Sequence, residues 1–291
     1  MNLFTPLQYE FFVRGLIVAT LVGGLCGLIG VYIVLRRMSY IGHGLAHAIF
    51  GGAVTSYVLS INLFIGASVW GFVSAMLINM AARKRKINAD AAIGIVTTAS
   101  FALGVALISR FKTFTRSFDA ALFGNILGIT NNDLIAIVTV SIIAIIVVFI
   151  GYKYLLFTTF ESEVAGFYGV PTPWVDAVFS LLLAAVIVVS LQVLGVTMIA
   201  AAVVIPPVVA QLLTNSFNKM LILSVVIGAL CGLAGLYVSF YIDVSSGASV
   251  VLISAVLFVV VLTITSLKQR ILSSKMRTPS HNHLDRQIDI H

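Results

Sequence analysis

Charge is the scarcest property of this sequence. Only 9% of its 291 residues are Asp, Glu, Lys or Arg, against about a quarter in an average soluble domain. A soluble fold of this length exposes too much surface to be covered by so few charged side chains. The scarcity therefore excludes an ordinary soluble enzyme, a nucleic-acid-binding protein and a disordered protein.

Cysteine is also rare, and the N-terminal residues lack the pattern of a cleaved signal peptide. Cys26 and Cys231 are the two cysteines, and both lie inside apolar runs. Two buried thiols provide neither a disulfide framework nor a zinc ribbon. No small-residue cleavage site follows a short apolar core near the N-terminus, so we expect no signal peptide there.

Apolar residues are abundant, at 60% of the chain, and the mean hydropathy is +1.13. Runs near the roughly 20 residues that a bilayer-crossing helix needs recur throughout. They cover residues 13–35, 40–60, 63–82, 89–109, 134–157, 174–193, 195–213, 219–241 and 249–267. Because no alternating barrel pattern is present, the sequence predicts an all-α polytopic transmembrane helical bundle. The weak split at Leu194–Gly195 leaves eight or nine spans.

The apolar runs define one membrane domain over residues 1–271. Residues 272–291 are polar and are expected to form a disordered cytoplasmic tail. With nine crossings, thirteen of the 17 Lys and Arg residues fall on the side of Arg36, Arg37 and the run 83–86. The positive-inside rule then places the N-terminus outside and the C-terminus in the cytoplasm. The net charge of +7 therefore encodes orientation.

Two histidines are the titratable side chains that lie clearly inside a predicted span. His43 and His47 are four residues apart, so both imidazoles share one helix face. They start roughly 9–15 Å beyond Arg37 at the rise of an α-helix. Polar groups at such depth mark a pathway or a bound ion, and two imidazoles on one face can ligate a divalent cation. The alternative is a pair satisfied by interhelical hydrogen bonds.

Enzyme chemistry has no support in the same residues. The segment 43–47 reads HGLAH and lacks the glutamate base of an HExxH protease. Membrane di-iron oxygenases need several more histidines, and the three others all lie in the tail. The glycine-rich stretch 23–30 has no Gly-Lys-Ser/Thr, so ATP binding by a P-loop is not expected. We predict a protein that is not an enzyme and holds no permanent cofactor.

The polar segment 158–173 predicts a short helix at the membrane surface. Thr158 or Thr159 would cap it. Its acidic residues and its small face are Glu161, Glu163, Ala165 and Gly169. An exposed helix of this kind suits docking by a cytoplasmic partner, and the alternative is a plain connecting loop.

Two prolines interrupt the run 195–213. Pro206 and Pro207 are adjacent, and proline inside a helix removes a hydrogen bond and kinks or breaks the helix. The freed carbonyls would face a cavity if this span forms part of a gate or translocation path. The alternative is a kinked helix without such a role.

A short sequence echo links two distant spans. GGLCGLIGVY at 23–32 is similar to GALCGLAGLY at 228–237. Glycines three or four residues apart let helix backbones approach closely. We therefore predict tight helix packing, with an internal repeat as the alternative.

Five motifs in order resemble the permease subunit of ATP-binding cassette (ABC) importers for manganese, zinc or iron. They are VLRRMSYIGHGLAHAIFGG (34–52), NADAAIGIVTTASFALG (88–104), LFGNILGIT (122–130), FESEVAGFYGV (160–170) and VIPPVVAQLL (204–213). The resemblance covers most of residues 8–268 and implies a type II ABC importer-like fold.

The resemblance also implies partners in the cell (plasma or inner) membrane. These are a second copy in a homodimer, two cytoplasmic ATP-binding subunits that hydrolyse ATP, and an extracytoplasmic metal-binding lipoprotein. The remaining contacts are with membrane lipid, and nucleic acid is not involved. The segment 161–169 is implied to dock on the ATPase, which distinguishes this function from the alternative, a secondary transporter that needs no ATPase.

Metal handling in this family centres on an Asp and a His that map to His43 and His47. His43 stands where the family usually has Asp, and Glu161 also replaces an Asp. Carboxylate suits Mn²⁺, whereas imidazole suits Zn²⁺ and Fe²⁺. The resemblance itself makes Mn²⁺ the leading cargo, with Zn²⁺ and Fe²⁺ as alternatives. The replacement of Asp by His43 weakens a manganese site, so it bears on which metal is carried.

Overall fold

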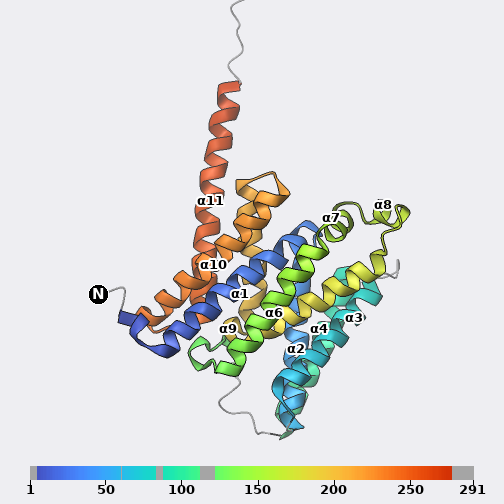
Figure 1. The fold of residues 1–291 in the computed structure, drawn as a ribbon, viewed down its shortest axis with the longest axis vertical. Coiled ribbons are helices and arrows are strands. Elements are labelled where there is room, and N and C mark those ends of the chain that lie inside the picture. Colours follow the sequence, from blue (N-terminus) through green and yellow to red (C-terminus); the bar gives the residue numbers. More distant parts are fainter. Residues whose placement is uncertain (1–4, 60, 83–87, 112–121, 277–291) are drawn as a thin grey trace, which may run out of the picture.

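The computed structural model describes residues 5–59, 61–82, 88–111 and 122–276, and every regular element in these ranges is helical (Figure 1). The elements are the 3₁₀ helices η1 (Thr5–Gln8) and η2 (Ile126–Gly128) and the α-helices α1 (Glu10–Leu35), α2 (Ser39–Val58), α3 (Leu63–Ala82), α4 (Ala89–Phe111), α6 (Asn131–Ile150), α7 (Tyr152–Phe160), α8 (Ser162–Phe167), α9 (Thr172–Leu213), α10 (Phe217–Ile242) and α11 (Ser246–Met276). The basic run 83–86, Lys112, Arg116 and the tail histidines lie outside the described residues.

The predicted all-α membrane bundle is confirmed. Helices α1, α4, α6, α9, α10 and α11 are long and apolar enough to cross a membrane, and α2 and α3 have 20 residues each. Apolar side chains cover these helices, and a helix satisfies most of its own backbone hydrogen bonds, as a bilayer requires. Helix α11 continues to Met276, so it includes the first residues of the segment predicted as a tail.

Helix α9 is divided at Gly195, where the backbone has φ 73° and ψ 161°. Figure 1 shows the yellow first part of α9 descending from α8 and the golden second part returning toward the start of α10. A side chain at Gly195 would collide with the Leu122 carbonyl. Residues 122–125 brace the bend, because Thr197 Oγ1 donates to Leu122 O at 2.7 Å and Asn125 N donates to Gln192 O at 2.9 Å. The interruption predicted at Leu194–Gly195 is therefore real.

The two proline residues behave differently from the prediction. Pro206 and Pro207 lie inside α9, and Gly195 is the one residue of that fully described helix with non-helical backbone angles. Proline at 207 leaves the Val203 carbonyl without its helical donor. A Cβ on Gly30 would collide with that carbonyl oxygen, so the backbone of α1 covers it. The freed carbonyl thus meets a neighbouring helix. Of the kink or break that the prolines predicted, a break of the helical backbone angles is absent at both positions of this described helix, and the gating role stays a prediction.

The predicted fifth span, 134–157, is two helices. Helix α6 starts at Asn131 because Thr130 and Asp133 form a capping box, and it ends at Ile150 before the Gly151 cap. Helix α7 then continues separately to Phe160. The apolar run therefore extended past the spanning helix into an element that supports α8.

The tight packing predicted from the glycine echo is confirmed. Helix α1 packs most extensively against α10. A Cβ on Gly23 would collide with the Gly228 carbonyl, and one on Gly27 would collide with the Ser224 carbonyl. Ser224 Oγ also donates to Gly27 O across the interface at 2.7 Å. Backbone-to-backbone contact of this kind needs small residues at the interface, and here glycine on α1 faces glycine or serine on α10.

Gly23→Ala is expected to destabilise the bundle, and Gly24→Ala is its matched control. The added methyl at 23 has no space, whereas a methyl at 24 would meet Val225 Cγ1 at an ordinary 3.6 Å. Overpacking of this kind costs about 1–3 kcal/mol, so we expect the melting midpoint of Gly23→Ala to fall by roughly 5 °C. Thermal unfolding of the detergent-purified chain measures the difference. Equal midpoints for the two variants would contradict the packing described here.

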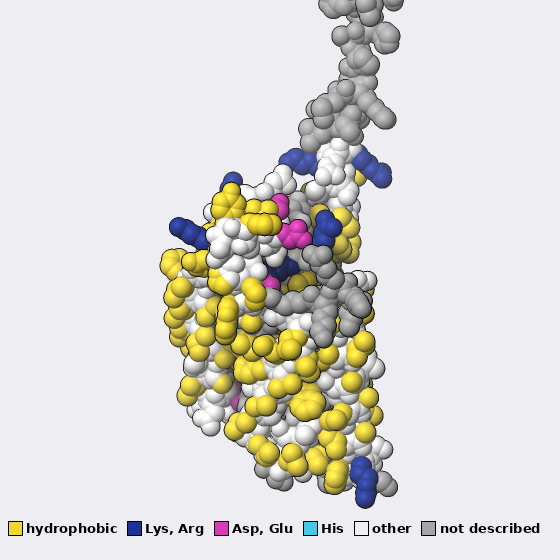
Figure 2. All heavy atoms as spheres, turned by 90° about the vertical axis from the view of Figure 1, so that its right-hand side faces the viewer, with side chains coloured by type: hydrophobic (Ala, Val, Ile, Leu, Met, Phe, Trp, Pro, Cys, Tyr) yellow, Lys and Arg dark blue, Asp and Glu magenta, His cyan; other side chains and the backbone are white. Residues whose placement is uncertain are grey.

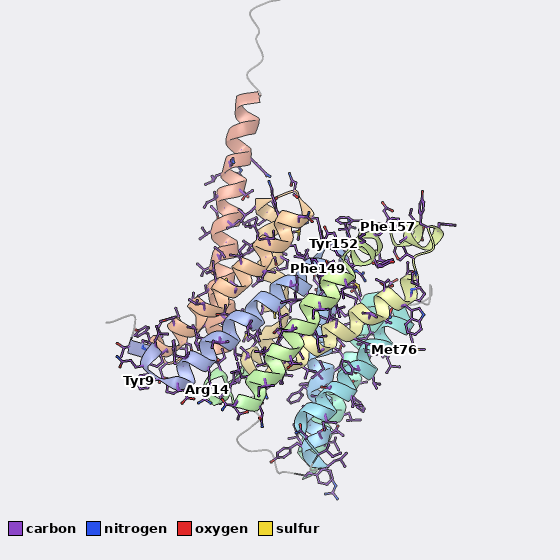
Figure 3. The ribbon with its side chains drawn as sticks, viewed as in Figure 1. Tyr9, Arg14, Met76, Phe149, Tyr152 and Phe157 are labelled. Atoms are coloured by element: carbon purple, nitrogen blue, oxygen red, sulfur yellow. The ribbon has the colours of Figure 1, made fainter. Side chains whose placement is uncertain are left out.

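Charged side chains separate the bundle into two ends. The end that carries Arg36, α7 and α8 is called the α8 end below, and the end that carries Arg14 and Asp133 is called the opposite end. Figure 3 shows Tyr152 and Phe157 at the first and Arg14 at the second. In Figure 2 charged spheres gather near the top of the face, and the band below them is mostly hydrophobic. Such a band is what a bilayer core contacts.

Candidate functional site

The two predicted site histidines lie together on α2. Their ring centroids are 4.4 Å apart with an interplanar angle of 77°. His43 is exposed and His47 is half-buried. The shared helix face expected from the i, i+4 spacing is therefore present. The pair lies at the surface of the single chain, with His43 exposed.

Helix α4 forms the wall beside the histidine pair. The His47 ring meets the Phe101 ring edge-on, with centroids 5.0 Å apart. A Cβ on Gly44 would lie 2.7 Å from Thr97 Oγ1, so the glycine lets the hydroxyl of α4 approach α2. Thr97 and Phe101 are four residues apart and thus share one face of α4. The site is therefore built from a histidine face on α2 and a Thr–Phe face on α4.

Two buried polar atoms at this interface have no hydrogen-bond partner within the described residues. They are His47 Nδ1 and Thr97 Oγ1. Buried polar atoms in folded proteins are nearly always hydrogen-bonded to protein or to ordered water. Interhelical hydrogen bonding, the alternative raised for the pair, therefore does not satisfy His47 Nδ1 here. The arrangement leaves one imidazole nitrogen and one hydroxyl oxygen available to a water molecule or a cation.

Thr97 was missed by sequence reasoning because a single threonine in an apolar span carries no signal of its own. In the part of the chain that the structure describes, no group of three or more His, Cys, Asp or Glu side chains is placed to hold a metal ion. One chain thus presents a two-histidine site with a nearby hydroxyl. This is suited to transient contact with an ion more than to a closed structural metal centre.

The four residues predicted for docking do not share one surface. Glu161 and Glu163 are exposed, and Glu163 lies in the first turn of α8. Ala165 is fully buried, so its methyl packs inward and supports α8. Gly169 has φ 79° and open space around it, which is the left-handed backbone that ends many helices.

Two exposed aromatic side chains were missed in the same segment. Phe167 is 91% exposed and Tyr168 is 79% exposed. Large aromatic residues rarely stay in water without a partner, and they dominate the energetics of many interfaces. Their position between Gly166 and Gly169 was the signal that could have identified them. They make α8 a candidate contact surface.

The sequence had suggested Thr158 or Thr159 as the cap of the short helix, but both lie inside α7, and Glu161 is the residue before α8. Their hydroxyls accept hydrogen bonds from Arg36 instead. Arg36 Nη2 donates to Thr158 Oγ1 at 2.9 Å and Nε donates to Thr159 Oγ1 at 3.1 Å. Nη1 donates to Asp176 Oδ1 at 2.9 Å, and the guanidinium carbon lies 4.6 Å from the centre of the Phe179 ring. Burial lowers the pKa of Arg36, and the Asp176 carboxylate opposes that change. Arginine nevertheless stays charged in proteins.

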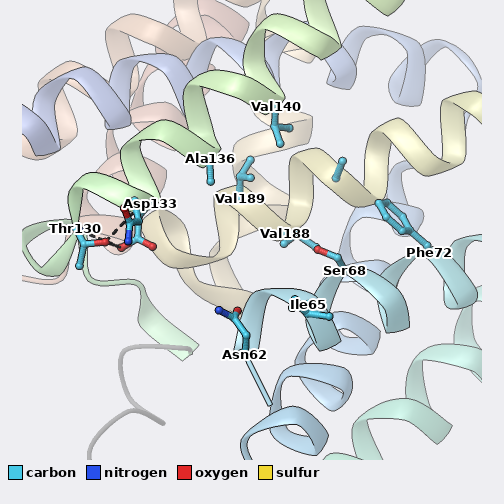
Figure 4. Close-up of a pocket in the computed structure, with 12 residues that line it drawn as sticks. Asn62, Ile65, Ser68, Phe72, Thr130, Asp133, Ala136, Val140, Val188 and Val189 are labelled. Atoms are coloured by element: carbon cyan, nitrogen blue, oxygen red, sulfur yellow. Dashed lines mark hydrogen bonds between the residues drawn. The ribbon is translucent and has the colours of Figure 1, made fainter. Parts of the chain in front are cut away.

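A separate pocket of about 530 Å³ opens among the starts of α3 and α6 and the middle of α9 (Figure 4). Asn62, Ser68, Thr130 and Asp133 supply polar groups to it. Asp133 Oδ2 already accepts from Thr130 N at 2.9 Å and from Thr130 Oγ1 at 2.8 Å. The carboxylate therefore serves the α6 cap, and the pocket does not include the histidine pair.

Comparison with known proteins assigns this chain to a family. The sequence model of the ABC 3 transport family matches residues 8–265, which is most of the chain. The chain belongs to the ABC 3 transport family. As a family member it is a multi-pass membrane subunit of an ABC transporter and not an enzyme.

Relatives of this ABC 3 family member carry manganese in their names. The "Manganese transport system membrane protein MntC" of Listeria monocytogenes is 37% identical over 271 residues, covering 93% of this chain and 96% of that protein. The "Manganese import system permease protein ScaB" of Streptococcus gordonii is 35% identical over 270 residues, covering 93% and 96%.

A solved structure confirms the ABC permease fold. The structure titled PsaBC from Streptococcus pneumoniae in complex with Fab matches with a TM-score of 0.80 and 33% identity. The match covers 89% of this chain and 94% of that one. The type II importer-like architecture expected from the sequence is thus confirmed at the level of the family fold.

Proposed function

We propose that this chain is the permease of an ATP-driven importer that carries a divalent transition metal, with Mn²⁺ as its leading cargo and Zn²⁺ and Fe²⁺ as alternatives. The observation that carries the proposal is the adjacent imidazole pair on α2. The buried Nδ1 of His47, which has no hydrogen-bond partner in the part of the chain that the structure describes, supports the same role. The relatives named for manganese transport support the choice of metal.

His43 and His47 contact the ion as it passes. Imidazole nitrogens bind divalent transition metals, and Thr97 Oγ1 supplies a hydroxyl oxygen at the same helix interface. A two-histidine site holds an ion less firmly than a four-ligand cage. Weak holding suits a path from which the ion must leave.

A second copy of the chain completes the path. His43 is exposed in the single chain, and an ion beside it would face the hydrocarbon of the bilayer. Charged species at that depth are stable only when a protein surface or water surrounds them. A homodimer that covers this face of α2 and α4 supplies such a surface.

The α8 end faces the cytoplasm and receives the ATP-binding subunits. The basic residues on that side within the described ranges are Arg36, Arg37, Lys153, Lys219, Lys268, Arg270 and Lys275. Basic residues gather on the cytoplasmic side of membrane proteins. An extracytoplasmic lipoprotein then delivers the metal to the opposite end. In this arrangement the N-terminus lies outside and the C-terminus inside.

Pro206 and Pro207 remain part of the proposal only as a buried element of α9. Both residues are buried, and the carbonyl freed by Pro207 lies against Gly30. Any gating motion of α9 is better supported by the Gly195 bend, where the two halves of the helix already have different directions. The prolines then hold the second half against α1.

Reconstitution tests the proposed function. The chain is co-purified with its cytoplasmic ATPase, placed in proteoliposomes loaded with ATP and Mg²⁺, and supplied with the extracytoplasmic lipoprotein carrying radioactive Mn²⁺. Uptake is expected to require ATP and to stop with an ATPase variant that cannot hydrolyse it. Uptake by the chain without ATPase or ATP would identify a secondary transporter. Competition by Zn²⁺ and Fe²⁺ ranks the metals.

A further inference from the structure

Arg36 joins three helices at the α8 end. It follows the last residue of α1, and its guanidinium bonds to Thr158 and Thr159 on α7 and to Asp176 on α9. Each of its three nitrogens uses a different acceptor. The side chain is 9% exposed, and its face lies over the Phe179 ring. This is a planar, multidentate contact that arginine makes and lysine cannot reproduce.

The same residue begins the connection to the histidine helix. Arg36 caps α1, Arg37 adopts a left-handed backbone with φ 56°, and α2 starts at Ser39. His43 follows in the second turn of α2. A rigid helix therefore runs from this short turn directly to the proposed cargo site.

The docking segment, residues 161–169, begins just after the threonines that Arg36 contacts. Thr159 lies two residues before Glu161, where α7 ends and α8 follows. Within the described contacts, α8 packs on α7 and α9, the two elements that Arg36 holds. A displacement of α8 would therefore move α7 and α9, and both of these helices are hydrogen-bonded to Arg36.

We propose that Arg36 is the positioning residue that couples movement of the docking segment to the α1–α2 turn and, through it, to His43 and His47. The proposal rests on the proposed function, in which an ATPase docks at α8. Coupling between two sites is a free energy carried by contacts that both sites bias. The buried charge-assisted contacts of Arg36 are the ones that link these two sites most directly.

The test uses Arg36→Gln in the reconstituted complex of permease and ATPase. Co-purification of the ATPase and basal ATP hydrolysis are expected to stay within about twofold of the unchanged complex. Metal taken up per ATP hydrolysed is expected to fall by about 10-fold, within the usual range of coupling effects. Arg37→Gln is the matched control, because it removes the same charge from the neighbouring, exposed position and should leave the ratio unchanged.

Two further variants keep the test decisive if Arg36→Gln is poorly folded. Thr158→Val with Thr159→Val removes the α7 acceptors and leaves the Arg36–Asp176 pair. It should therefore lower the uptake-to-hydrolysis ratio without changing ATPase co-purification or basal ATP hydrolysis. Arg36→Lys should recover only part of that ratio.

The outcomes separate this proposal from the docking proposal. An unchanged uptake-to-hydrolysis ratio in Arg36→Gln, or in the threonine double variant, overturns the coupling role and leaves docking at α8 untouched. Loss of ATPase co-purification in step with loss of uptake also overturns it, because Arg36 would then only support the folded shape of α8. Loss of co-purification in the Phe167 variant described below concerns docking alone.

Discussion

His47→Ala is expected to lower metal uptake by about 100-fold or more while the permease still assembles with its ATPase. The substitution removes the imidazole whose Nδ1 is buried at the α2–α4 interface with no hydrogen-bond partner among the described residues. Loss of even an outer-shell group at a metal site costs about 10–100-fold, so loss of a proposed ligand should cost at least as much. Uptake of radioactive Mn²⁺ into proteoliposomes, with ATPase co-purification measured on the same sample, gives both values.

His281→Ala is the matched control, because it removes a histidine from the C-terminal tail and should leave uptake unchanged. Thr97→Val, which replaces the hydroxyl by a methyl of similar size, is expected to lower uptake less than His47→Ala. Full uptake in His47→Ala would contradict the assignment of the pair to the ion path. Loss of assembly together with uptake would show that the histidines serve packing.

His43→Asp tests which metal the pair favours. The family that the sequence resembles usually has Asp at this position, and carboxylate suits Mn²⁺ better than imidazole does. His43 is exposed, so the shorter side chain enters without a packing clash. Uptake should persist, and the ratio of Mn²⁺ to Zn²⁺ uptake should rise relative to the unchanged permease. An unchanged or lower ratio would argue that metal preference is set elsewhere, for example by the delivering protein.

Phe167→Ala is expected to weaken ATPase binding by about 30-fold, because truncating a central aromatic anchor commonly costs about 2 kcal/mol. Phe167 is 91% exposed on α8, and the truncation leaves the buried Ala165 in place. The fold should therefore be unaffected. Binding of the purified ATPase to immobilised permease, with the melting midpoint as a check on folding, measures the effect.

Phe149→Ala is the matched control for the docking prediction. Phe149 is 82% exposed on α6, so the same truncation is made at an equally open aromatic position away from α8. ATPase binding should not change in this variant. Equal binding by both variants and the unchanged chain would refute docking through Phe167.

The membrane bundle was predictable because its signals are local. Apolar runs of spanning length predicted most of the described helices, and the glycine spacing of 23–32 and 228–237 predicted the close contact of α1 and α10. The i, i+4 spacing of His43 and His47 predicted their shared face, since that geometry belongs to any α-helix. Each of these conclusions needs only residues that are near one another in the chain.

The prolines and the docking segment show where local signals fail. Pro206 and Pro207 predicted a kink or a break with a carbonyl facing a cavity, but the carbonyl freed by Pro207 is covered by Gly30, which lies far away in the sequence. Thr158 and Thr159 are of a residue type that often caps helices, yet both accept hydrogen bonds from Arg36. Ala165 was grouped with the docking surface, although neighbouring helices bury it.

The sequence by itself determined that this protein lies in a lipid bilayer, that it is all-helical and that its two histidines share one helix face. Scarce charge excludes a soluble fold, and helical periodicity alone sets the side-by-side rings. Only the tertiary structure decided which polar atoms have partners. The contacts of Arg36 join residues 122 to 140 positions apart. The packing of α4 on α2 buries Nδ1 of His47 with no partner among the described residues. Such contacts depend on the relative positions of whole helices, which no local pattern specifies.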